Sequence, residues 1–302
     1  MEHRSDLAGQ RQQRQLDGTL PNGSEISYGN YNWMVPGQIS VPGAVKNLAY
    51  DALQRPTSIE VKNLAAQLLV KRLYQYDAAG NITQIESDLG QISYGYDSLD
   101  RLTQVRPDNA LQVLGLPQEQ YSYDQVGNRP VSGHQPGTWA YNSDNQMTQY
   151  PRLVPFSGGA SPIDTSVSYS PQGHTAKETS SQGERSYAYN AAERLIKYSN
   201  TPQGQPSPSL EAGYRYDPFG RRISKSVKGG AMMLTTYFVY SDQGLMAETN
   251  DQGQITKAYG FNPLASQQGL WSTDPVWQAN VVNGSLTDTA TQIHYLHTDH
   301  LG

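Results

Sequence analysis

The stretch Tyr76-Asp77-Ala78-Ala79-Gly80-Asn81, followed by Ile82-Thr83-Gln84-Ile85, contains the signals of a turn and of the strand after it. Aspartate at the first turn position can accept hydrogen bonds from backbone N–H groups two residues on, and glycine at the fourth position takes a positive φ without steric cost. The alternation of apolar and polar residues after the turn is typical of a strand. The stretch therefore predicts one end of a β-hairpin.

The same pattern recurs along the chain, and eight copies start at Tyr50, Tyr76, Tyr96, Tyr123, Tyr141, Tyr169, Tyr189 and Tyr216. The steps between these tyrosines are 26, 20, 27, 18, 28, 20 and 27 residues, so that short and long steps alternate. Repetition at this spacing predicts hairpins with loops of variable length. We expect the turns to be fixed by the pairs Asp77 and Gly80, Asp124 and Gly127, and Asp217 and Gly220.

The tyrosines themselves are interpreted as a ladder that holds neighbouring hairpins in register. Cross-strand aromatic pairs stabilise a sheet by roughly 0.2–1 kcal/mol each, and register is strongly specified where one face is covered. The alternative is a surface on which sugars or other flat ligands stack.

Composition narrows the classes of function. Hydrophobic residues make up 36% of the 302 residues and charged residues 16%, both below the roughly 45–50% and 25% of an average globular chain. The 21 tyrosines argue against disorder, while a net charge of −5 without a basic cluster argues against binding to nucleic acid or to an anionic membrane. The lack of cysteine excludes disulfides and thiolate chemistry.

The chain is predicted to be a single domain, residues 1–302, with clear repeats over 48–225, a three-strand meander over 231–262 and a less regular end over 263–302. Residues 151–162 and 200–213 are rich in Pro, Gly and Ser and are predicted to be surface loops. Residues 61–70 have helical spacing, but their position between a strand and a repeat tyrosine favours a hairpin. No apolar stretch is long enough for a membrane span, and the first residues lack the core of a signal peptide.

The Tyr-Asp repeats, together with the ending His297-x-Asp299-His300-Leu301-Gly302, resemble the rearrangement hot spot (RHS) or YD-repeat proteins of bacteria. The resemblance extends from a degenerate repeat at residues 6–11 to the last residue. It implies an all-β fold, in which the hairpins form one long antiparallel sheet that curls as part of a hollow shell. A single-layer sheet with two wet faces needs few apolar residues, in agreement with the composition.

The resemblance also implies a function. Such shells enclose a toxic C-terminal domain and leave the bacterial cytoplasm by type VI secretion or as subunits of toxin complexes, without a classical signal. In the family the chain continues beyond this ending with further strands, a self-cleavage motif and the toxin. We therefore interpret the sequence as a non-enzymatic shell segment, whose partners would be the toxin cargo, the remaining shell segments, and secretion or toxin-complex subunits. The alternative is an extracellular adhesion or glycan-binding YD-repeat module.

His294, His297, Asp299 and His300 have the ligand types of a zinc site, but His294 and His297 have opposite parity on a strand and would face opposite sides. Residues 217–220 match the start of the family's self-cleavage motif, but Ser224 stands where the motif needs a later glycine, and the repeat explains them as a turn. The acidic turns lack the ligand spacing of known calcium loops. No metal, cofactor or catalytic residue is expected.

Far-UV circular dichroism of the purified chain should show dominant β-structure, with helix below about 10%, because turn signals recur at hairpin spacing throughout. A spectrum dominated by helix would contradict the repeat interpretation.

Overall fold

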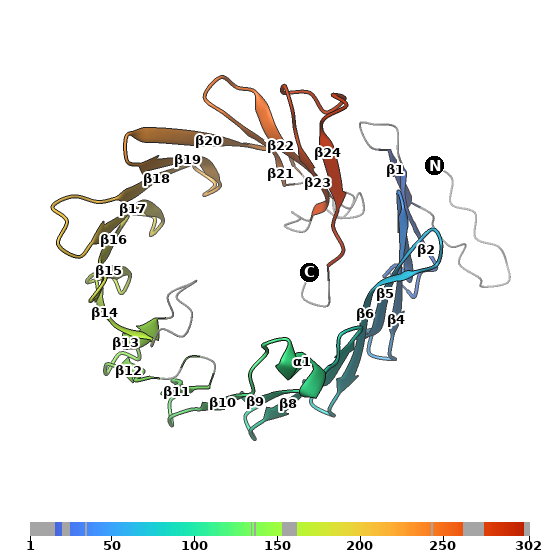
Figure 1. The fold of residues 1–302 in the computed structure, drawn as a ribbon, viewed down its shortest axis with the longest axis horizontal. Coiled ribbons are helices and arrows are strands. Elements are labelled where there is room, and N and C mark those ends of the chain that lie inside the picture. The colour runs from blue at the N-terminus through green and yellow to red at the C-terminus, as the bar shows by residue number, and fades with distance from the viewer. Residues whose placement is uncertain are drawn as a thin grey trace. The chain divides into compact units, whose positions relative to one another are not determined.

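The chain is described by a computed structural model over residues 16–19, 25–33, 35–133, 135, 137–152, 162–242, 244–261 and 275–298. The strands of this part follow one another in chain order as two antiparallel sheets (Figure 1). The first sheet contains β1 (Leu16–Thr19), β2 (Glu25–Gly29), β3 (Gln38–Val41), β4 (Ala44–Tyr50), β5 (Pro56–Asn63), β6 (Leu68–Tyr76), β7 (Ile82–Ser87), β8 (Gln91–Tyr96), β9 (Leu102–Pro107), β10 (Glu119–Ser122) and β11 (Val131–Ser132).

The second sheet contains β12 (Ala140–Tyr141), β13 (Met147–Arg152), β14 (Ile163–Tyr169), β15 (Thr175–Ser180), β16 (Gly183–Tyr189), β17 (Leu195–Pro202), β18 (Leu210–Tyr216), β19 (Arg222–Gly229), β20 (Met232–Tyr240), β21 (Leu245–Thr249), β22 (Ile255–Phe261), β23 (Pro275–Asn280) and β24 (Gln292–Tyr295). The prediction of an all-β chain built from hairpins is confirmed. The strands divide between two sheets, with the break between β11 and β12.

The chain divides into two compact units, one of residues 1–93, 240–247 and 255–302, and one of residues 94–239 and 248–254. The first unit has a small apolar core on strands β2 to β5, which contains Ile26, Tyr28, Val41, Ala44 and Val61. Trp277 of β23 and Tyr295 of β24 pack against this core. Within this unit, therefore, residues from both halves of the sequence share one core.

The second unit has little core. Its buried side chains in the described part are Pro107, Leu111, Ser132, Pro151, Thr165, Ala212 and Ser224. Most other strand residues there are partly exposed on both faces, as along β16 and β17. Because so little apolar area is removed from water, strand pairing and contacts between hairpins must supply much of the stability of this unit.

The hairpin predicted over residues 61–70 is confirmed, and it is formed by β5 and β6. Asn63 Oδ1 accepts hydrogen bonds from the backbone N–H groups of Ala65 (3.0 Å) and Gln67 (2.9 Å), and Ala66 takes a φ of 60°. The polar turn residues thus override the helical spacing of the leucines, because the asparagine side chain offers the backbone a turn in place of a helix.

The loop predicted over residues 200–213 is wrong in part. β17 continues to Pro202 and β18 begins at Leu210, with Asn200 opposite Leu210 and Ser199 opposite Glu211. Polar residues extend these strands because the neighbouring strand satisfies their backbone, and Glu211 forms an ion pair with Lys197 across the pair (3.1 Å). Only residues 203–209 connect the strands.

The loop predicted over 151–162 is described only at its ends. Pro151 and Arg152 belong to β13, and residues 153–161 lie outside the described part. The degenerate repeat at 6–11 also lies outside the described part. The meander is confirmed as β20, β21 and β22. The sequence did not predict α1 (Asn109–Val113), a short helix capped by the Asp108 carboxylate, which accepts from the Leu111 N–H.

The turn glycines give a test that depends on backbone conformation alone. Gly127 has a φ of 93°, and a Cβ placed on it would meet no atom within 4 Å. Gly127→Val should therefore lower the free energy of unfolding by about 1–3 kcal/mol through backbone strain, without a steric clash. Urea denaturation measures the change.

Gly229 of β19 is the matched control, since a Cβ there also meets nothing within 4 Å and its φ is not positive. Gly229→Val should change the free energy of unfolding by less than about 0.5 kcal/mol. Equal effects of the two substitutions would show that conformation is not what Gly127 provides.

Candidate functional site

Each repeat turn is closed by the side chain at its first position. In the turn after β6, Asp77 Oδ1 accepts from the N–H groups of Gly80 and Asn81, both at 2.8 Å, while Asp77 N–H donates to the Asn81 carbonyl (2.9 Å). The side-chain amide of Asn81 lowers the pKa of the Asp77 carboxyl, and the backbone N–H of Arg101 does the same for Asp97. The turn therefore favours a charged carboxylate at its first position.

Asp124 and Asp217 bind their turns in the same way, through the N–H groups of Asn128 (2.8 Å) and Arg221 (2.9 Å). Gly80, Gly127 and Gly220 all have positive φ, between 88° and 100°. Gln54, Asp100, Asn145 and Glu193 hold this fourth position in other repeats, with φ between 58° and 63°. In most repeats the register shifts by one residue at the strand end, as between Gln75 and Tyr76, so that a bulge follows the turn.

The fifth turn position is chemically matched to the first. Where the first residue is aspartate, the fifth donates to its second oxygen, as Asn81 does to Asp77 (3.1 Å) and Arg101 does to Asp97 (2.7 Å). In the turn at Asn142, whose first residue is asparagine, Gln146 accepts from its side-chain amide (2.8 Å). The turn at Asn63 and Gln67 has the same pairing (2.7 Å) without a repeat tyrosine, so the spacing of Asn and Gln was the signal that could have located it.

The repeat tyrosines join each hairpin to the one before it. Each is half-buried and lies at the end of a strand, or one residue beyond it at Tyr123, and in six repeats its hydroxyl donates to a backbone carbonyl of the preceding hairpin. These bonds run from Tyr50 to Pro36 (3.1 Å), Tyr76 to Pro56 (2.7 Å), Tyr123 to Leu102 (2.7 Å), Tyr141 to Arg129 (3.1 Å), Tyr169 to Met147 (2.7 Å) and Tyr216 to Leu195 (2.8 Å). We call this row of contacts the seam.

Cations from the preceding turn cover the tyrosine rings of the seam. The guanidinium carbon lies 4.4 Å from the ring centroid for Arg55 over Tyr76 and 4.5 Å for Arg101 over Tyr123. In another repeat the imidazole of His174 stacks on Tyr189, with centroids 4.7 Å apart. One arginine thus holds its own turn through aspartate and the next hairpin through tyrosine. Tyr96 occupies the same position at the end of β8.

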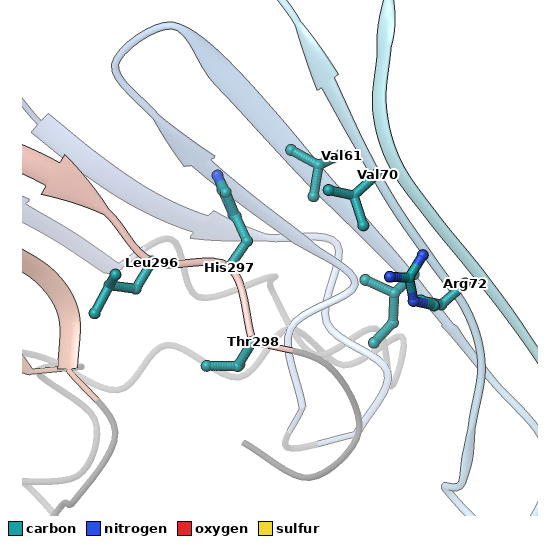
Figure 2. Close-up of a pocket in the computed structure, with 7 residues that line it drawn as sticks. Val61, Val70, Arg72, Leu296, His297 and Thr298 are labelled. Atoms are coloured by element: carbon teal, nitrogen blue, oxygen red, sulfur yellow. The ribbon is translucent and has the colours of Figure 1, made fainter. Parts of the chain in front are cut away.

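The conspicuous end motif is only partly described. His297 and Thr298 follow β24, while Asp299, His300, Leu301 and Gly302 lie outside the described residues. Figure 2 shows Leu296, His297 and Thr298 of this segment on one side of the pocket, and Val61, Val70 and Arg72 on the other. A cavity of about 540 Å³ lies there, lined by Ile59, Val61, Val70, Arg72, Leu296, His297 and Thr298.

Lys46 fixes this terminal segment, a role that the sequence did not indicate. Its side chain is 5% exposed on the inner strand β4, and its ammonium donates to the Thr298 carbonyl at 2.6 Å. Burial, together with the charge of Lys46, lowers the pKa of His297. An ammonium in an apolar setting requires a strong acceptor, so Thr298 and Lys46 hold each other in place.

Of the four residues weighed above as zinc ligands, only His294 and His297 belong to the described part. His294 lies on β24 and contacts the side chain of Asn280 (3.2 Å), and no cluster of three metal-binding side chains occurs among the residues described. In the same part of the chain, no helix has the length and apolar character needed to cross a membrane.

Comparison with known proteins gives consistent matches. Residues 42–302 match the family described as the teneurin YD-shell. The chain is 25% identical over 243 residues to Double-stranded DNA deaminase toxin A of Burkholderia cenocepacia, covering 76% of this chain and 15% of that protein. It is 26% identical over 275 residues to Toxin protein Tse5 of Pseudomonas aeruginosa, covering 83% and 18%.

Among solved structures, the crystal structure of TcdB2-TccC3-TEV aligns with 93% of this chain and 17% of its own, at 14% identity and a TM-score of 0.46. The chain thus spans less than a fifth of the length of these proteins.

The seam can be tested by removing one hydroxyl. Tyr123→Phe keeps the ring under Arg101 but deletes the bond to Leu102, and should lower the free energy of unfolding by about 1 kcal/mol in urea denaturation. Tyr237→Phe on β20, where the side chain is 43% exposed, is the control and should change it by less than about 0.5 kcal/mol. If the two variants have the same free energy of unfolding, the seam bonds do not stabilise the sheet.

Proposed function

Because the chain belongs to the teneurin YD-shell family, we propose that it forms part of the wall of a hollow shell that encloses a toxic domain of the same polypeptide. The wall is one sheet thick, and its role is structural. The chemistry of the toxin lies elsewhere in the polypeptide, and this chain contributes enclosure.

The observation that carries the proposal is the seam. A sheet without a second layer cannot be held together by core packing, and needs bonds that run within its own plane from hairpin to hairpin. The bonds from Tyr123 to Leu102 and from Tyr216 to Leu195 have this direction, and Arg101 over Tyr123 adds a second contact. Partial exposure of both faces, as along β16 and β17, suits a wall with water on each side.

The names of the relatives support a toxin as the cargo. Two of them are called toxins, and the chain matches less than a fifth of each, which leaves most of their length for other parts. We expect the partners of this chain to be the remaining wall segments and a toxin cargo. Export from a bacterial cytoplasm, by type VI secretion or within a toxin complex, is part of the same proposal.

Limited proteolysis tests the proposal. The complete polypeptide encoded by the gene that contains this chain, with whatever sequence flanks it, is treated with protease, and survival of the region beyond residue 302 is followed by mass spectrometry. That region should survive much longer within the polypeptide than when it is produced alone. The double variant Arg101→Ala/Tyr123→Phe should shorten its survival, because it loosens the wall.

Val126→Ser is the matched control, since Val126 lies in the turn after Tyr123 and is 68% exposed. It should leave the protection unchanged. A region that is cleaved equally fast inside and outside the polypeptide would refute enclosure. Specific binding of the chain to a glycan array, without such protection, would instead support an adhesion module.

A further inference from the structure

The β19–β20 hairpin ends in a cluster of exposed apolar side chains. Met232, Met233 and Leu234 are 68%, 64% and 65% exposed, and they follow directly on the turn at Gly230 and Ala231. Gly229 pairs with Met232 to close the hairpin, and Gly230 takes a φ of 63°. Large apolar side chains exposed together at one place mark a surface that binds a partner.

The charges on this hairpin have one sign. Between Pro218 and Ser241 the sequence contains four cations, Arg221, Arg222, Lys225 and Lys228, and no acidic residue, although the whole chain has a net charge of −5. The overall charge, which by itself argues against an anionic partner, therefore conceals a local basic segment, and the expectation that the chain lacks a basic cluster does not hold for this hairpin.

The arginines of this segment are engaged within the sheet, whereas the lysines are not. Arg221 pairs with Asp217 (2.6 Å), and Arg222 lies over the ring of Phe238 (4.9 Å). Within the described residues, neither Lys225 nor Lys228 forms an ion pair. Glu211 stands opposite Lys228 in the register but is paired with Lys197 (3.1 Å).

The groups are arranged in layers from the tip. The three apolar side chains lie within about three residues of the turn, a depth of roughly 10 Å at 3.3 Å per residue. Lys228 stands opposite Met233 and Lys225 opposite Thr236, so the lysines lie at and behind the apolar layer, and the exposed ring of Tyr237 follows. An anchor at a lipid interface has the same order of groups. Its apolar side chains lie deepest in the lipid, lysines with flexible stems come next, and a tyrosine lies nearest to water.

A lipid surface fits this tip better than a protein groove does. Successive side chains of a strand point to opposite faces, so a protein docked on one face would cover Met232 and Leu234 but leave Met233 in water. A lipid phase that receives the tip covers all three. The unpaired lysines select anionic headgroups.

We propose that the β19–β20 hairpin binds an anionic lipid surface, with Met232, Met233 and Leu234 in the interfacial region and Lys225 and Lys228 at the headgroup phosphates. Attachment at this point would hold the chain against a membrane without any membrane-spanning segment. The partner differs from the cargo, and this inference stands whether or not the chain encloses one.

The β5–β6 hairpin is a control supplied by the chain itself. Its end carries three exposed leucines, Leu64, Leu68 and Leu69, which are 79%, 45% and 51% exposed. Its lysines are neutralised, however, because Lys62 pairs with Glu60 (2.9 Å) and Lys71 with Glu86 (2.6 Å). The two hairpins match in apolar groups and differ in free positive charge.

Because the chain has no cysteine, Met233→Cys creates a single attachment site for a polarity-sensitive fluorophore, and Leu69→Cys creates the matched site on the control hairpin. Vesicles of phosphatidylcholine with phosphatidylglycerol should shift the emission of the label at 233 to the blue, and added salt should reverse the shift. Vesicles of phosphatidylcholine alone should shift it much less, and the label at 69 should not respond.

Vesicle sedimentation with the unlabelled chain gives the second readout. Lys225→Gln and Lys228→Gln should each weaken binding about fivefold. The triple change of residues 232–234 to serine should abolish binding, whereas serine at Leu64, Leu68 and Leu69 should not; all six positions are exposed, and circular dichroism confirms that each variant is folded.

The proposal is overturned if the label at 233 responds equally to neutral vesicles, if it does not respond to anionic ones, or if both triple variants lose binding to the same extent. A label at 233 that responds only to added protein would show that the tip docks on a protein instead.

Discussion

A tyrosine hydroxyl that donates to the backbone carbonyl of the preceding hairpin is the contact on which the rest of each sheet depends. A strand pair is already joined by its own ladder, but a turn at the end of that pair is free to splay from its neighbour. The bonds of Tyr76 to Pro56 and of Tyr169 to Met147 tie successive turns together at a fixed offset. The acceptor carbonyls of Pro56 and Met147 lie where the register of their own strand pairs shifts, so that a bulge interrupts the ladder beside them.

The turns are suited to this task because each carries its own internal closure. Aspartate is matched with a donor, Asn or Arg, and Asn142 is matched with the acceptor oxygen of Gln146. Arginine at the fifth position serves two partners, as Arg101 does with Asp97 and Tyr123. The closure of one turn and the attachment of the next hairpin thus depend on a single arginine side chain. Contacts of this kind allow a sheet with little core to be built from polar residues.

The two kinds of hairpin end have different roles. The repeat turns hold the seam, while the connections between repeats vary in length and composition, from the polar residues 203–209 to the apolar tip at Met232 to Leu234. Variation is tolerated there because those hairpin ends take no part in the seam. In the first unit a different device appears, since the buried Lys46 binds Thr298 and brings strands β23 and β24 to the core of β2 to β5.

The sequence by itself determined the hairpins, their turns and the all-β class, because those depend on interactions within about five residues, such as Asp77 with Gly80 and Asn81. It did not determine where the strands around residue 200 end, since that depends on the neighbouring strand. Nor did it reveal the partners of the tyrosine hydroxyls, 12 to 22 residues away, or the bond from Lys46 to Thr298, 252 residues away. Only the tertiary structure decided these contacts, because bulges, register and the burial of one lysine bring together groups that no local pattern connects.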